Sequence, residues 1–584
     1  MTNPFYVDES SPWFSEEAGW PPEVPKNHDF EKITMGEALD RAAKENPDNH
    51  VMWFLETYMT FADFNDKVNR FAAAIHGLGL RKGDVLALML PNSFQYAIGY
   101  YACARVGVIV TGVNPTYKAG EVKHQMKLTG AKAIVVLDVL YKDAIEPIIR
   151  DTSIEHLIVT NVTDLAAISG FKRWLGKRLG KIPTAPAPKG ALQFTDLLKT
   201  DPKLPDVDVS ADDVHTYIMT GGTTGVPKAA VLTHFNCVSN AMQSRLWLHK
   251  MEVGTASIGV IPVFHSFAMT CVMNICALHG GMMILFPRPP KDADLVDTIM
   301  RITPPQGCLY PGAEVLFKRL GEWPEIKNFD LSGKIVLCVS GAGPLHRPVQ
   351  EKFEEATGAR LVEGYGLSET SPVVSAGPFW GNRKIGTIGL PFTGTEWRIV
   401  DSGDATKQLP FDEAGEIAVA GPQVMKEYLN NPNETAETIV EMDGKRWLLT
   451  GDIGRMDPQG RITIEDRKKQ LIKFKGYSVY PTEIETMVME HPAVNEVAVA
   501  GIPHEKFGEV IKAWIVLNLD KKGQIEPEEI IAWAKQNFTH YKVPYSVQFI
   551  DELPKTLVGK VLRRVLQEAD PAFQAAKQKQ ESKS

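Results

Sequence analysis

The sequence predicts an α/β fold with a large N-terminal domain of mainly parallel sheets covered by helices and a small α+β domain at the C-terminus. Three observations lead to this prediction. The chain has 584 residues, more than one compact core normally contains. Short β-rich segments alternate with helical patterns over most of its length, as in βαβ units. Beyond about residue 460 the segments become shorter and more highly charged.

The N-terminal part is expected to hold the parallel sheets. Apolar, β-rich runs predict strands at residues 85–90, 133–137, 156–159, 282–286 and 335–339. Apolar residues at helical spacing predict helices at 69–78 and 349–356. Each helix carries the chain back to the end of the sheet at which the previous strand began. Strands that alternate with helices therefore run in the same direction and pair in parallel.

The C-terminal part has a different pattern. A strand-like run at 461–465 is followed by a dense group of charged residues at 466–475. Further strands are predicted at 494–501, 512–517 and 545–550, and helices at 482–490, 527–536 and 561–568. We therefore divide the chain into residues 1–468, with a core from about residue 30, and residues 469–584.

Composition and charge narrow the class of partner. Hydrophobic residues make up 44% of the chain and charged residues 23%, which is typical of a globular protein. A net charge of -8 argues against the basic surface expected of a nucleic-acid-binding protein. The first residues lack a signal-peptide pattern, and the longest mostly apolar run, 271–286, is too short to span a bilayer. We therefore expect a cytoplasmic protein that acts on small molecules.

The strongest local motif is a strand followed by a loop rich in glycine and threonine. It runs Thr220-Gly221-Gly222-Thr223-Thr224-Gly225-Val226-Pro227-Lys228. Glycine lets backbone N–H groups approach an anion, the threonine hydroxyls add donors, and Lys228 adds a positive charge. The pattern predicts a polyphosphate site. A Walker A loop, as in P-loop kinases and ATPases, is disfavoured because Pro227 precedes the lysine and Ala229 follows it.

This loop resembles the phosphate-binding loop of the adenylate-forming superfamily, which includes acyl-CoA synthetases, firefly luciferase and peptide-synthetase adenylation domains. Gly221 stands where many members have serine, and Ala229 where most have glycine. Later motifs follow in the family's order: Glu363-Gly364-Tyr365-Gly366-Leu367-Ser368-Glu369-Thr370, Gly415-Glu416-Ile417, Thr450-Gly451-Asp452, Arg467 and Pro554-Lys555-Thr556-Leu557-Val558-Gly559-Lys560. Their shared order carries the resemblance, because each motif alone is weak.

The resemblance implies a site for ATP and magnesium. Tyr365 would cover the adenine, and Asp452 and Arg467 would bind the ribose. Glu369 and Thr220 would bind the Mg²⁺ that ATP brings. The implied nucleotide-binding residues are Thr220, Gly221, Gly222, Thr223, Thr224, Gly225, Lys228, Tyr365, Gly366, Ser368, Asp452, Arg467 and Lys560. The implied catalytic residues are Lys560, Lys228, Thr220, Glu369 and His265, the last beside the channel for the acyl and pantetheine chains.

The resemblance also implies two reactions with a domain movement between them. A carboxylic acid would react with ATP to form acyl-AMP, and the acyl group would then pass to coenzyme A. Between the steps the small C-terminal domain would rotate about Lys469. This mobile domain would withdraw Lys560 and bring forward the residues that bind coenzyme A: Lys473, Lys475, Gly476 and Tyr477.

The substrate is the least determined feature. Residues 363–374 and 415–428 most resemble bacterial long-chain fatty acid ligases, which favours a medium- to long-chain fatty acid. An aromatic acid, a carrier protein as acyl acceptor and a luciferase-like oxygenase remain alternatives. A non-catalytic homologue is disfavoured because Lys560, Asp452 and Glu369 are all present. The sequence leaves the acyl chain length and the oligomeric state open.

Residues 168–190 form a basic segment without acidic residues. Its basic residues are Lys172, Arg173, Lys177, Arg178, Lys181 and Lys189. Apolar residues recur at helical spacing at Ile168, Phe171, Leu175, Leu179 and Ile182, which predicts an amphipathic helix. A solvated surface insertion and peripheral contact with an anionic membrane are the two interpretations.

Overall fold

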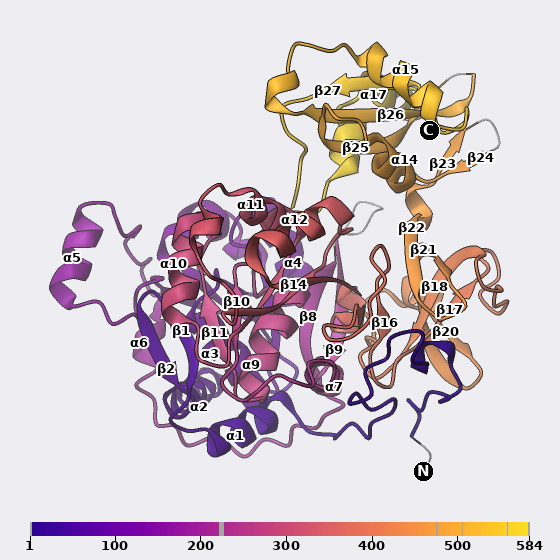
Figure 1. Ribbon diagram of the computed structural model, residues 1–584. Helices are drawn as coiled ribbons and strands as arrows, with labels where there is room; N and C mark the ends of the chain where they lie inside the picture. The colour runs from indigo at the N-terminus through magenta and orange to yellow at the C-terminus, as the bar shows by residue number, and fades with distance from the viewer. Residues whose placement is uncertain (1–2, 221–226, 475–476, 505, 557–558, 582–584) are drawn as a thin grey trace. The chain divides into compact units, whose positions relative to one another are not determined.

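The computed structural model describes residues 3–220, 227–474, 477–504, 506–556 and 559–581 (Figure 1). The chain forms two compact units. Unit 1 consists of Met1–Glu396 and Val419–Leu448, and unit 2 of Trp397–Ala418 and Leu449–Ser584. The predicted division between residues 468 and 469 stays a prediction; Lys469 lies within unit 2, in the short 3-10 helix Lys468–Gln470 that follows β22.

Unit 1 contains a nine-stranded sheet among its described residues. The strands lie in the order β16 (Leu390–Pro391), β15 (Val373–Ala376), β14 (Arg360–Gly366), β13 (Ile335–Ser340), β12 (Cys308–Gly312), β10 (Ala256–Gly259), β11 (Met282–Leu285), β1 (His50–Phe54) and β2 (Thr57–Thr60). The central pairs are parallel, and the pairs at both edges are antiparallel.

A second, eight-stranded sheet belongs to the same unit. Its order is β19 (Glu427–Tyr428), β9 (Lys228–Thr233), β8 (Val214–Thr220), β4 (Ile109–Gly112), β3 (Val85–Met89), β5 (Ala133–Leu137), β6 (His156–Thr160) and β7 (Leu192–Gln193). From β8 to β7 all pairs are parallel. The prediction of mainly parallel sheets in the N-terminal domain is therefore confirmed.

Helices cover these sheets (Figure 1). The longer ones are α1 (Met35–Glu45), α2 (Phe61–Gly77), α3 (Phe94–Val106), α4 (Ala119–Thr129), α7 (His234–Trp247), α10 (Asp292–Ile302), α11 (Glu314–Glu322) and α12 (Arg347–Thr357). Every residue of α3 is buried, and most of them are apolar, as expected of a helix that is covered on all sides. Phe54 of β1, Leu88 of β3 and Tyr101 of α3 belong to one apolar cluster, so α3 and both sheets share a core.

The helix predicted at 69–78 begins eight residues earlier, at Phe61, so the predicted start was wrong. Thr60 caps the helix, because its hydroxyl accepts a hydrogen bond from the backbone N–H of Asp63 at 3.2 Å. Phe61 and Phe64 then continue the buried face that ends at Ile75. The polar residues between Asn65 and Asn69 hid this continuation, because they lie on the opposite face of the same helix.

Unit 2 has its own apolar core, and it contains all strands of one smaller sheet and most strands of another. One sheet contains β17 (Glu396–Val400), β18 (Ala414–Ala420), β21 (Lys445–Met456) and β22 (Ile462–Arg467), with β20 (Ile439–Met442) also paired to β21. The other contains β24 (Tyr477–Val479), β23 (Ile472–Phe474), β26 (Gly508–Leu517), β25 (Val494–His504) and β27 (Ser546–Phe549). Its helices are α14 (Pro481–Val488), α15 (Pro527–Asn537), α16 (Arg563–Ala569) and α17 (Pro571–Glu581).

In the part of the chain that the structure describes, no helix combines the length and the apolar character needed to cross a bilayer.

Candidate active site

The strands before and after the predicted phosphate loop belong to the eight-stranded sheet. β8 and β9 pair antiparallel, and this register places Thr220 opposite Lys228. Residues 229–232 of β9 are all buried, which fixes the strand and therefore the place where Lys228 enters the loop. Five predicted nucleotide-binding residues lie outside the described residues: Gly221, Gly222, Thr223, Thr224 and Gly225.

Lys228 has two partners within unit 1. Its ammonium group forms an ion pair with the carboxylate of Glu434 and lies 4.5 Å from the ring centroid of Tyr428. Only 14% of its side chain is exposed. Glu434 lies in the first turn of α13 (Pro432–Thr438), where the side chain of Asn431 caps the helix. The position of Lys228 is therefore defined by both an ion pair and a cation–π contact.

Tyr428 joins the lysine to the predicted magnesium ligand. It lies in β19, which pairs with β9 so that Tyr428 is opposite Ala230. Its hydroxyl donates a hydrogen bond to Oε1 of Glu369 at 2.8 Å. Burial, together with the neighbouring charge of Glu369, raises the pKa of Tyr428 above its usual value, so the phenol keeps its proton. The backbone N–H of Met425 also donates to the carbonyl of Glu369, at 2.8 Å.

The donor set around Glu369 fits magnesium brought with ATP. Carboxylate and hydroxyl oxygens are hard ligands, and Mg²⁺ is commonly held by one or two carboxylates together with substrate phosphates. Glu369 offers Oε2, which has no hydrogen-bond partner among the described residues, and Thr220 offers a hydroxyl. No group of three or more histidine, cysteine, aspartate or glutamate residues among the described residues forms a complete metal cage. Glu369 and Thr220 would hold the ion jointly with the nucleotide.

The tyrosine motif ends β14 and continues into a short 3-10 helix, Ser368–Thr370. Tyr365 is half-buried. Gly366 is required by packing, because a Cβ there would lie 2.1 Å from the carbonyl oxygen of Pro372. At the start of the motif, burial raises the pKa of Glu363 to about 8, so this carboxyl is mostly protonated at neutral pH.

His265 lies next to the same motif. Its ring accepts a hydrogen bond from the backbone N–H of Phe267 at 3.3 Å and caps α8 (Ser266–Ala268). The hydroxyls of Ser266 and Ser368 are 3.3 Å apart. The structure therefore brings the segment of His265 to the serine that precedes Glu369, although about a hundred residues separate them in the sequence.

Unit 2 contains the two predicted ribose ligands. β21 and β22 place Asp452 opposite Arg467, and Nε of Arg467 lies 3.0 Å from Oδ1 of Asp452. Glu416 supports the turn before Asp452 by accepting a hydrogen bond from the backbone N–H of Gly451 at 3.0 Å. Lys468 pairs with the second oxygen of Glu416 at 2.8 Å. Because Asp452 is 4% exposed and paired, its carboxylate has a fixed direction.

The remaining predicted residues lie further along unit 2. Lys560 is exposed and follows Gly559, which has a φ of +81°. The backbone N–H of Lys473 donates to Glu509 at 2.8 Å, and its side chain is exposed. Tyr477 begins β24, but its side chain, that of Lys469, and all of Lys475 and Gly476 lie outside the described residues. The predictions for these four residues therefore stay predictions.

Four residues in the networks around the predicted site residues were given no role from the sequence. They are Tyr428, Glu434, Glu416 and Lys468. Lys468 directly follows Arg467, and Glu416 lies in the motif Gly415-Glu416-Ile417, so both positions offered a clue in the sequence. Tyr428 and Glu434 gave no such clue, because Glu434 meets Lys228 across 206 residues of sequence.

Comparison with protein families identifies the family of the chain. A model described as AMP-binding enzyme matches residues 39–429, which include the phosphate loop, the tyrosine motif and Tyr428. The chain belongs to the AMP-binding enzyme family. A model of the C-terminal domain of AMP-binding enzymes also matches residues 483–560, which end at Lys560.

This AMP-binding enzyme is similar to proteins that share almost its whole length. A long-chain-fatty-acid–CoA ligase of Bacillus subtilis (strain 168) is 36% identical over 572 residues, which are 97% of this chain and 99% of that protein. 4-Coumarate–CoA ligase 1 of Arabidopsis thaliana is 30% identical, with 87% of each chain covered. The crystal structure of ATP-bound MatB from Rhodopseudomonas palustris has a TM-score of 0.76 and 26% identity, covering 92% of this chain and 99% of that one.

Proposed function

We propose that this AMP-binding enzyme is an ATP-dependent acyl-CoA ligase that activates a medium- to long-chain fatty acid. The observation that carries the proposal is the network of Lys228, Tyr428 and Glu369, which unites the phosphate loop with the predicted magnesium ligand. The 36% identity to a long-chain-fatty-acid–CoA ligase over 97% of the chain supports the same substrate class.

The first reaction needs neutralisation of charge rather than a general base, because a carboxylic acid is already ionised at neutral pH. A carboxylate oxygen attacks the α-phosphorus of ATP, the bond to the bridging oxygen breaks, and pyrophosphate leaves with that electron pair. Lys228 and Lys560 would neutralise the phosphates during this displacement. Magnesium, held by Glu369 and Thr220, would add further positive charge. Asp452 and Arg467 would hold the ribose and so orient the α-phosphate for attack.

The second reaction transfers the acyl group to a thiol. The sulfur of coenzyme A attacks the acyl carbon, the thiol proton passes to solvent, and AMP leaves as the C–O bond breaks. In the proposed cycle, the C-terminal domain, residues 469–584, rotates about Lys469 between the two reactions. Lys560 withdraws, and Lys473, Lys475, Gly476 and Tyr477 take its place around the pantetheine chain. Glycine at 476 suits a narrow channel, because a Cβ would obstruct the chain.

A product assay across substrates tests this function. Purified protein is incubated with ATP, Mg²⁺ and fatty acids of graded chain length, with and without coenzyme A. The expected products are pyrophosphate, AMP and, when coenzyme A is present, the acyl thioester. ADP as the stoichiometric product would refute the proposal. Faster turnover of 4-coumarate or benzoate than of every fatty acid would show that the substrate is an aromatic acid. Acyl transfer only to a carrier protein would show that the acceptor is not coenzyme A.

We further propose a cytoplasmic location with peripheral contact at the inner face of the membrane through residues 168–190. Fatty acids partition into lipid, so an enzyme that visits the membrane surface meets its substrate there. The basic composition of this segment supports the contact.

A further inference from the structure

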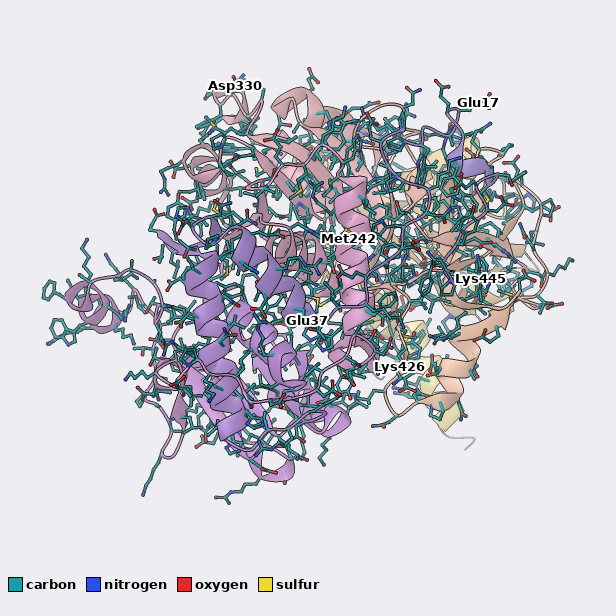
Figure 2. The ribbon with its side chains drawn as sticks, turned by 90° about the horizontal axis from the view of Figure 1, so that it is seen from below. Glu17, Glu37, Met242, Asp330, Lys426 and Lys445 are labelled. Carbon is teal, nitrogen blue, oxygen red and sulfur yellow. The ribbon has the colours of Figure 1, made fainter. Side chains whose placement is uncertain are left out.

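Helix α5 (Gly170–Arg178) stands apart from the other helices of unit 1 (Figure 1, Figure 2). None of its residues is buried. This helix is shorter than the predicted amphipathic pattern, which extends to Ile182, but it contains the centre of that pattern.

Both ends of the surrounding segment are attached to unit 1. Before the helix, the backbone N–H of Ala167 donates to the hydroxyl of Thr57 at 2.7 Å. After it, Asn161 donates to the carbonyl of Pro183 at 2.8 Å, and the hydroxyl of Thr184 donates to Asp138 at 2.9 Å. The helix is therefore presented on a fixed base and is not the end of an unattached loop.

An apolar stripe runs along α5 and is exposed to solvent. Phe171, Trp174 and Leu175 occupy positions i, i+3 and i+4, which lie on one face of a helix. Phe171 is 70% exposed and Trp174 is 53% exposed, and their stacked rings lie 6.2 Å apart. Leu179, directly after the helix, is 60% exposed. Large apolar side chains grouped in this way indicate a surface that binds an apolar partner.

Basic side chains flank the apolar stripe. Lys172, Lys177, Arg178 and Lys181 are within or next to α5, and residues 168–190 contain no acidic residue. The guanidinium of Arg178 lies 5.4 Å from the ring centroid of Trp174, so it covers the ring while keeping its charge at the surface. Aromatic residues beside lysine and arginine are typical of helices that lie in the headgroup region of an anionic bilayer.

We infer that α5 is a membrane anchor that inserts Phe171, Trp174 and Leu179 into the interface of an anionic bilayer while the surrounding lysines and Arg178 contact lipid phosphates. The opposite charges of the segment and the headgroups, together with the exposed aromatic side chains, identify lipid as the occupant. The inference deepens the proposed function by assigning residues to the membrane contact. Vesicle binding is measured without ATP or coenzyme A, so it can fail or succeed independently of ligase activity.

The experiment is flotation of the full-length protein with vesicles of phosphatidylcholine alone or of phosphatidylcholine and phosphatidylglycerol in equal amounts. Wild type is expected to bind the anionic vesicles and to lose affinity as salt is added. The variant F171S/W174S should lose at least about tenfold in affinity. The variant K172Q/K177Q/R178Q/K181Q should lose about fivefold for each neutralised residue.

Two matched variants control for general effects of charge and exposed aromatic rings. Phe411→Ser removes an aromatic ring that is 49% exposed elsewhere, and should bind as wild type does. K44Q/K142Q/K327Q/K535Q removes the same number of positive charges from other exposed positions. Lipids brominated on their acyl chains should quench the tryptophan fluorescence of the wild-type protein, because Trp174 is inserted among the chains. Trp174→Phe should bind the vesicles as tightly but show less quenching, because the inserted indole is missing.

Equal affinity of wild type and either α5 variant for anionic vesicles would overturn the inference. Absence of vesicle binding by wild type would also overturn it and would favour an acidic protein as the partner of α5.

Discussion

Lys228 and Lys560 would neutralise the same polyphosphate, but their surroundings are opposite. Lys228 is 14% exposed, paired with Glu434 and packed on Tyr428. Lys560 is exposed on a turn closed by a hydrogen bond of 2.8 Å from the N–H of Thr556 to its carbonyl. A lysine fixed by several partners suits a contact that ATP needs on arrival. A lysine on a surface turn suits a contact that is made in one reaction and withdrawn in the next.

The largest effect is expected from Lys560→Ala. Loss of one positioned electrostatic contact should slow adenylate formation by about 10² to 10⁴. Conversion of synthetic acyl-AMP and coenzyme A to the thioester should stay near the wild-type rate, because Lys560 has withdrawn by then. Pre-steady-state measurement of each half-reaction checks this expectation.

Two further variants complete that test. Lys555→Ala removes another lysine of the segment that carries Lys560. It loses only an ion pair with Glu496 and should leave both half-reactions intact. Gly476→Leu should show the opposite defect, with pyrophosphate release preserved and thioester formation slowed. If Lys560→Ala and Gly476→Leu lose both half-reactions in parallel, the alternation is wrong.

Lys228→Gln should act on ATP binding, in contrast to Lys560→Ala. Loss of a charge-assisted contact to phosphate corresponds to about 1.5–3 kcal/mol, so the KM for ATP should rise roughly 10- to 100-fold. Lys426→Gln is the control, because Lys426 is exposed beside β19 (Figure 2). An unchanged KM for ATP with a lower kcat would show that both lysines act only in the transition state.

Tyr428→Phe tests whether the fixed lysine and the magnesium ligand form one unit. The variant removes the hydrogen bond that orients Glu369 and keeps the ring under Lys228. Loss of such a supporting contact should raise the Mg²⁺ concentration needed for half-maximal adenylation by about tenfold. Tyr58→Phe, at an exposed tyrosine of β2, should have no effect. A magnesium titration identical to that of the wild type would show that the hydrogen bond from Tyr428 to Glu369 does not contribute to magnesium binding.

The smallest effect is expected from Glu434→Gln, and its sign is informative. Glu434 competes with phosphate for Lys228, so its neutralisation should tighten pyrophosphate binding by about fivefold, or about 1 kcal/mol. Glu437→Gln, on an exposed position of the same helix, is the matched control. Calorimetric titration with pyrophosphate measures the change. Weaker binding would mean that the positioning of Lys228 by Glu434 outweighs its competition with phosphate.

The sequence predicted the features that depend on local pattern. Alternating β-rich and helical segments located β5 and β13 closely, because a strand's apolar run is contained within a few residues. Glycine, threonine and lysine at short spacing predicted a phosphate loop at 220–228, and that role stays a prediction. Residue order also sufficed to recognise the tyrosine motif, and comparison with the AMP-binding enzyme family supports that recognition.

Only the tertiary structure decided which distant residues meet. Glu434 reaches Lys228 because β19 pairs with β9 and α13 follows β19 directly. The residues around Lys228 in the sequence carry no pattern that would predict this pairing. Likewise, helical spacing predicted an amphipathic helix near Phe171, but not whether its apolar face would be covered. Periodicity determines which side chains share a face, whereas the packing of elements far apart in sequence determines whether that face is buried or, as in α5, left exposed.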